Sequence, residues 1–196
     1  MRRRSLVPLT CGVMALLAAC GASSEEPAQP TASGGAHAPT EASDVAPITP
    51  EGRRVELGDV GSVVVPATAT VEQRQTGTPA EQLVVVFDDP ARSAVEITWA
   101  TEDPADVDEA SWAMEQAARV NPAISDYERT RVTWPGSPVS VLATWTEEMP
   151  GDTGAQVEGI RLAVKDEQDR SVALVGFAPT LAGSDAESVV LSLQLG

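Results

Sequence analysis

VALVGF, residues 172–177, is apolar at every position, and so is LVVVF at residues 83–87. Successive side chains of a β-strand point to opposite faces of its sheet. A strand that is apolar at every position must therefore be covered on both sides. These two runs predict the central strands of a sheet that carries further layers on both faces.

Further strands and two helices are predicted around these central runs. Residues 95–99 alternate apolar and polar side chains, as expected for a strand with one wet face, and Ile160, Leu162 and Val164 alternate toward one face of another strand. Residues 131–145 predict a hairpin, since Pro135-Gly136 separates two apolar stretches. The predicted order is four strands, a helix, four strands and a helix. This order predicts an α+β fold, in which an antiparallel β-sheet is covered by helices.

Both predicted helices carry recognisable start signals. The first opens at residues 103–106 with acidic side chains, which the helix dipole favours, and has ended by Pro122. The second runs over residues 181–193, with N-terminal character at residues 184–187. The predicted inner stripe of the first helix consists of Val107, Ala110, Met114 and Ala117.

The N-terminus predicts export and a lipid anchor. Three arginines at positions 2–4 precede an apolar stretch, residues 6–19, that is too short to span a membrane. Leu17-Ala18-Ala19-Cys20 resembles the lipobox of bacterial prolipoproteins. That resemblance implies removal of residues 1–19 and diacylglyceryl and palmitate chains on Cys20. The protein would then be held by the lipid bilayer on the extracytoplasmic face of the cell membrane. An ordinary secretory signal with an accidental cysteine is the alternative.

The mature chain divides into a tether and one acidic domain. Residues 20–47 are rich in Ser, Ala, Gly, Pro and Glu without apolar periodicity, which predicts a disordered tether. Residues 48–196 then form the folded domain. Loss of the three signal-peptide arginines leaves ten basic against 29 acidic residues, a net charge of −19. Such a charge repels nucleic acid, so no nucleic-acid partner is expected.

The order of elements also resembles a known fold. The early strand end at Val65-Pro66, the strand ending at Trp99 and the C-terminal helix ending at Ser192-Leu193 resemble the PsbP-like α/β/α sandwich. Small actinobacterial lipoproteins of the LpqN type share that sandwich. The resemblance covers about residues 55–195. It implies a non-catalytic binding or accessory protein in cell-envelope biogenesis, with an envelope protein or lipid as its partner.

Few residues of the domain suit enzyme chemistry. His37 is the only histidine and lies in the tether, and the one cysteine of the mature chain is Cys20. A Ser–His or Cys–His pair and a histidine-based zinc site are therefore excluded from the domain. Glycine-rich phosphate loops are missing too, so neither catalysis nor a cofactor or metal is expected.

Acidic and aromatic residues provide the remaining candidates. The acidic run at residues 102–109 could supply oxygens to a hard cation, but its spacing does not match an EF-hand loop, and an acid-rich helix start is the preferred interpretation. A carboxylate pair could also serve a hydrolase.

Among the tryptophans, the strand pattern places Trp99 and Trp145 in the core. Trp134, beside Pro135-Gly136, is expected to be exposed, and Trp134 and Trp112 are the candidate ligand-binding residues. A lipid or glycolipid carrier, with its ligand in a groove between sheet and helix, is the alternative to a binding module.

Overall fold

The computed structural model describes residues 43–75, 80–87, 93–101, 106–149 and 154–196. The chain divides into two units, Met1–Ala36 and His37–Gly196. The first lies outside the described residues, and every helix and strand below belongs to the second. The strands are β1 (Ser43–Asp44), β2 (Arg53–Leu57), β3 (Gly61–Val65), β4 (Thr70–Arg74), β5 (Glu81–Val86), β6 (Ala94–Ala100), β7 (Ile124–Thr133), β8 (Val139–Glu148), β9 (Gln156–Lys165), β10 (Ser171–Ala178) and β11 (Gln194–Leu195), and the helices are α1 (Val107–Val120) and α2 (Asp185–Leu191).

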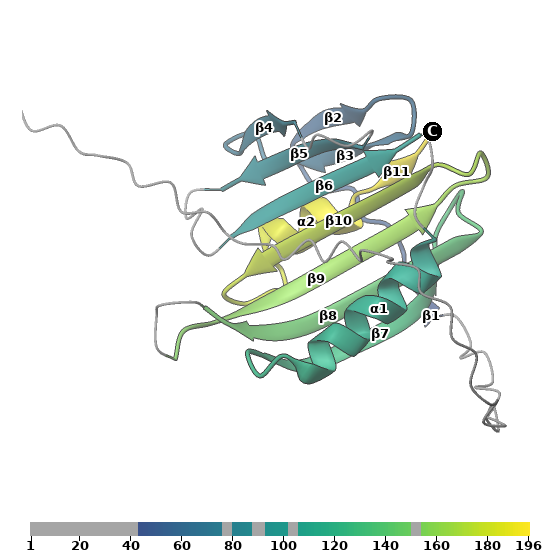
Figure 1. Cartoon of the computed structure of the whole chain (residues 1–196). Helices are drawn as coiled ribbons and strands as arrows, with labels where there is room; N and C mark the ends of the chain where they lie inside the picture. The colour runs from purple at the N-terminus through teal and green to yellow at the C-terminus, as the bar shows by residue number, and fades with distance from the viewer. Residues whose placement is uncertain (1–42, 76–79, 88–92, 102–105, 150–153) are drawn as a thin grey trace, which may run out of the picture. The chain divides into compact units, whose positions relative to one another are not determined.

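Most of the described strands form one large sheet with the order β1-β7-β8-β9-β10-β6-β5-β4 (Figure 1). Its neighbours are antiparallel except at one edge, where β1 runs parallel to β7. The prediction of an antiparallel sheet is therefore correct for its body and wrong for this edge. Strand β10, which contains the apolar run of residues 172–177, lies in the interior of the sheet between β9 and β6.

One face of the large sheet is closed by a second layer. Helix α2 and a small sheet with the order β11-β3-β2 pack there. The close approach of α2 is visible at Gly176 of β10, where an added Cβ would lie 3.1 Å from Cγ2 of Val190. The core between these layers is aliphatic and almost fully buried. Its most central members are Leu57, Val63, Val65, Val85, Val95, Ile97, Leu162, Leu174, Val189, Val190 and Leu193.

The opposite face carries α1, which lies across β7, β8 and β9 (Figure 1). Register proves that the two faces differ: Val141 and Ala163 contact α1, whereas their chain neighbours Leu142 and Leu162 point toward the aliphatic core. The apolar contact beneath α1 is small, since its buried members are only Val107, Val141 and Ala163. Helices on both faces of one sheet confirm the α+β class.

The predicted inner stripe of α1 is wrong in half of its positions. Met114 and Ala117 are exposed, and the buried residues of the helix are Val107, Ser111 and Ala118. The reason is that polar contacts to the sheet set the rotation of the helix. Ser111 faces Arg129 of β7 and accepts a hydrogen bond from it. With the helix rotated in this way, Trp112 and Met114 point away from the sheet.

The predicted hairpin and C-terminal helix are confirmed, although their ends differ. Strands β7 and β8 pair around the turn at residues 134–137, and α2 begins after its N-cap Ser184. Four strands were predicted before α1, and the described residues contain six, β1 to β6. The sequence pattern did not locate β2 and β4, because their sequences, RRVEL and TVEQR, are mostly polar. Ser43 and Asp44, within the predicted tether, pair with β7, so the folded part begins before residue 48.

A buried ion pair fastens the β9–β10 turn to the rest of the domain. The carboxylate of Asp166 accepts hydrogen bonds from the backbone N–H groups of Gln168 and Arg170 and from Nε of Arg170 at 2.6 Å. The same guanidinium donates to the carbonyl oxygen of Asp59, in the β2–β3 turn, and to that of Gly196 at the chain end. The predicted charged turn at residues 166–170 is thus confirmed, and it links three distant segments.

We predict that Asp166→Ala lowers the free energy of unfolding by about 3 kcal/mol, because it removes the buried carboxylate that pairs with Arg170 and leaves two backbone N–H donors without their acceptor. The side chain of Asp166 is only 2% exposed. Urea unfolding followed by tryptophan fluorescence measures the change. Glu167→Ala, in the same turn but exposed, is the control and should cost less than about 0.5 kcal/mol. Equal losses in the two variants would contradict a special role for the ion pair.

Candidate functional site

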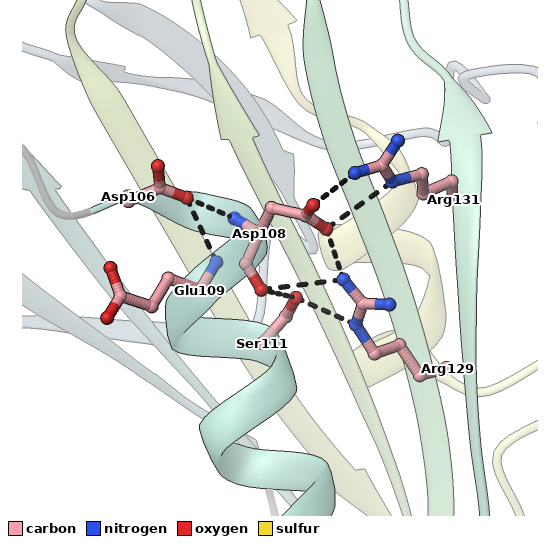
Figure 2. A network of polar contacts seen from close by, with 6 residues as sticks. All are labelled: Asp106, Asp108, Glu109, Ser111, Arg129 and Arg131. Atoms are coloured by element: carbon pink, nitrogen blue, oxygen red, sulfur yellow. Dashed lines mark hydrogen bonds and ion pairs between the residues drawn. The ribbon is translucent and has the colours of Figure 1, made fainter. Parts of the chain in front are cut away.

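The first turn of α1 is built by a capping aspartate. Asp106 is the N-cap, and its side chain accepts hydrogen bonds from the backbone N–H groups of Asp108 and Glu109, each at 2.9 Å (Figure 2). An N-cap carboxylate satisfies donors that have no partner within the helix and interacts favourably with the helix dipole. The prediction that acids mark this helix start is therefore confirmed for the described residues 106–109.

Asp108 joins this helix start to the large sheet. Its carboxylate forms ion pairs with both Arg129 and Arg131 of β7 (Figure 2). Oδ1 accepts from Arg129 and, at 3.4 Å, from Nε of Arg131, and Oδ2 accepts from Nη2 of Arg131. Ser111 reinforces the link, since its hydroxyl accepts a 2.8 Å hydrogen bond from Nε of Arg129 and donates to the carbonyl oxygen of Asp108. Arg129 and Arg131 project from one face of β7 because they lie two residues apart on a strand.

The two arginines keep Asp108 ionised. The hydrogen bond from Arg131 has the largest effect on the pKa of this carboxyl and lowers it. Burial has the second-largest effect and raises the pKa, but the charges of both guanidinium groups and the hydrogen bond from Arg129 lower it further, so that the pKa lies below its ordinary value. The same hydrogen bond raises the pKa of Arg131. A carboxylate in this state holds the helix in place and is a poor proton donor near neutral pH.

An open hollow of 420 Å³ lies beside this cluster. Its lining combines carboxylates, one guanidinium and one indole, from Asp106, Asp108, Glu109, Trp112 and Arg129. Trp112 is 58% exposed, an unusual state for the largest side chain. Farther along the same helix, Val120 is 81% exposed and Met114 36%. The hollow thus offers charged hydrogen-bonding groups next to one exposed indole.

The division of the tryptophans into buried and exposed side chains differs from the prediction at one position. Trp112 is exposed, and Trp99 and Trp145 are buried as predicted. Trp134 was expected to be exposed and is only 2% exposed, within the aliphatic core. The alternation of the strand explains the error, because Trp134 follows buried Val132 by two residues and so points to the same face. The prediction of Trp134 as a ligand-binding residue is therefore not supported by its position.

Other sequence candidates are not brought together. Cys20 lies outside the described residues, as do positions 102–105 of the acidic run. The described part of the chain contains no group of three or more His, Cys, Asp or Glu side chains arranged to hold a metal ion. The carboxylates of residues 106–109 instead cap the helix and pair with arginines.

Sequence reasoning missed the basic residues of the site. Arg129, Arg131 and Arg161 lie on β7 and β9 and face α1. Charged residues that alternate with apolar ones ordinarily mark a solvent-facing side. The signal that could have shown otherwise is the spacing of two from Arg129 to Arg131, opposite a helix start rich in acids.

We predict that Asp108→Asn lowers the stability of the domain above about pH 5 and has a diminishing effect at lower pH. A carboxyl group whose pKa is lowered by folding contributes stability above its unfolded pKa, about 3.9. This contribution is lost as the pH falls through the lowered, folded value. Urea unfolding of both proteins across this range measures the difference. Glu109→Gln, which removes an exposed acid in the same turn, is the control. A difference between wild type and Asp108→Asn that persists unchanged at pH 2 would contradict the assignment.

Comparisons with known proteins add no family to this geometry. The sequence matches no protein-family model, and a search of curated proteins found no similar sequence. Within the described residues, neither helix is long and apolar enough to cross a bilayer.

Proposed function

We propose that this chain is an extracytoplasmic lipoprotein, anchored through acylated Cys20, that acts as a non-catalytic binding or accessory module in cell-envelope biogenesis. Its partner binds at the N-terminal half of α1. The observation that carries this proposal is the exposure of Trp112 beside the open hollow. Exposed tryptophans next to charged groups are typical of the residues that contribute most to binding another protein.

The construction of α1 supports a docking role. A helix that served only to cover the sheet would turn its largest apolar side chains inward. Here the residues turned inward are small or polar, apart from Val107, and Trp112 and Val120 point outward. Asp108, Ser111 and the two arginines fix the helix so that these apolar groups remain available. The partner surface that fits is apolar with basic groups, since Asp106 and Glu109 at the hollow form no ion pair among the described residues.

The two alternative functions receive less support from the same residues. An internal lipid site calls for an enclosed, mainly apolar cavity. The hollow at α1 is open and lined mostly by charged side chains. A carboxylate-based hydrolase needs one acid with a raised pKa, and the pKa of Asp108 is lowered instead. Binding at the helix surface requires neither feature.

We predict that a photoreactive residue introduced at position 112 crosslinks to a specific envelope partner in living cells of the host. The matched control is the same residue at position 182, which is exposed and lies just before α2. A discrete adduct at position 112 that is absent at 182 is the expected result. Glu109→Gln should leave the fold intact and weaken the adduct, since it removes a charge from the hollow beside the crosslinker.

The lipid anchor is tested by the same crosslinking experiment in a variant that lacks Cys20. Cys20→Ala should release the protein from the membrane fraction and abolish the adduct. Equal adducts at positions 112 and 182 would contradict the docking surface. An unmodified Cys20 thiol in the native protein, seen by mass spectrometry, would instead contradict the anchor.

A further inference from the structure

A buried arginine on β9 has no partner among the described residues. Arg161 is 8% exposed, and its Nη1 atom is completely enclosed without a hydrogen bond. The residue forms no ion pair with any described carboxylate. Burial lowers its pKa, which reflects an environment that disfavours the positive charge.

Such a group is exceptional because buried charges are nearly always paired. A guanidinium has five donors and remains protonated in proteins. Leucine or methionine could occupy the same position between Ile160 and Leu162 without any electrostatic cost. An unpaired buried arginine therefore indicates an anion that completes the site when it binds.

Two neighbouring groups point to the same conclusion. The hydroxyl of Tyr127 on β7 is also buried without a hydrogen-bond partner among the described residues. Burial raises the pKa of this phenol, and the charge of Arg161 opposes the rise. Arg129 contributes further positive potential, and it lowers the pKa of Arg161. Its own hydrogen bonds go to Asp108 and Ser111, so it leaves Arg161 uncompensated.

The surroundings of Arg161 are shaped by small and aromatic residues. Its register neighbours are Ala143 on β8 and Val175 on β10. One row away, Trp145 lies between Tyr127, stacked at 6.0 Å, and Phe177, in an edge-to-face contact at 5.6 Å. The ring of Trp145 lies directly over Gly159, where any added Cβ would be 2.3 Å from it. These contacts give the site a rigid aromatic wall.

The β10 flank is the side of Arg161 that α1 leaves uncovered. Val175 and Phe177 are only half-buried, and the main contacts of α1 with the sheet are to β7, β8 and β9. A ligand that reaches the enclosed Nη1 atom must displace side chains of this flank, and the ion pairs of α1 can stay in place.

We propose that Arg161 and the hydroxyl of Tyr127 bind an oxyanion, a carboxylate or phosphate group of a ligand, at the border between α1 and β10. The planar guanidinium donates two parallel hydrogen bonds to such a group, and the phenol donates a third. The site is separate from the surface around Trp112, so a negative result for anion binding leaves the proposed docking surface untouched, and the reverse also holds. The anion can be free or can be the head group of a larger, partly apolar molecule.

The test uses the whole protein purified from its host and four probes: inorganic phosphate, acetate, octyl phosphate and octanoate. Thermal unfolding is followed by tryptophan fluorescence. At least one probe should raise the Tm of the wild type by about 5 °C or more at 100 times its Kd. A response to phosphate or acetate identifies a free anion as sufficient. A response to the octyl compounds alone identifies a ligand with an apolar part.

Three variants assign the binding to this site. Arg161→Met should abolish the rise in Tm, and without ligand it should be at least as stable as the wild type, because it removes an unpaired buried charge. Tyr127→Phe keeps the cation and should weaken binding about tenfold by removing one donor. If Arg161→Met does not fold, Tyr127→Phe alone still shows whether the probe binds at this site. Arg74→Met removes an exposed charge from the same face of the sheet, on β4, and should change nothing.

Two results would overturn the proposal. One is the absence of any rise in Tm with all four probes in the wild type. The other is a rise that survives unchanged in both Arg161→Met and Tyr127→Phe, since binding would then lie elsewhere.

Discussion

The alternation of side chains along β9 is the constraint on which both faces of the large sheet depend. Ile160, Leu162 and Val164 point into the aliphatic core and fix that face against α2 and the small sheet. The intervening Gly159, Arg161 and Ala163 must then lie on the face that carries α1. A slip of one residue would place a guanidinium in the aliphatic core, so the register of β8, β9 and β10 is strongly specified.

Because of this constraint, the two faces of the large sheet have different roles. The aliphatic face supplies the stability of the domain, because the great majority of its buried apolar surface lies there. The face that carries α1 has little apolar contact of its own, and polar groups hold the helix in position. Its aromatic row, its uncompensated cation and its exposed tryptophan are features that a purely structural layer does not need. Both the proposed docking surface and the proposed anion site belong to this face.

The sequence predicted the parts of the fold that depend on burial. Runs that are apolar at every position, such as β10, identified the interior strands, and the acids of residues 106–109 identified a helix start. The apolar pattern gave the wrong buried face for α1, because polar contacts to the sheet set the rotation of that helix. Nothing in the alternation of residues 107–118 shows that Ser111, rather than Met114, turns toward the sheet, because the partner Arg129 is distant in sequence. Trp134 was expected to be exposed because Pro135-Gly136 follows it. It is buried because it lies two residues after Val132 and therefore points to the same face of the sheet.

Native-state hydrogen exchange of the backbone amides tests the division between the two faces most directly. Amides in the middle of β9 and β10 should exchange only through global unfolding, since both strands are fixed by the aliphatic core. Amides of α1 should exchange through a local opening of lower free energy, and Asp108→Asn should lower it further without changing exchange in β9. Equal protection of α1 and β9 would contradict the account, because the helix would then be held as firmly as the core.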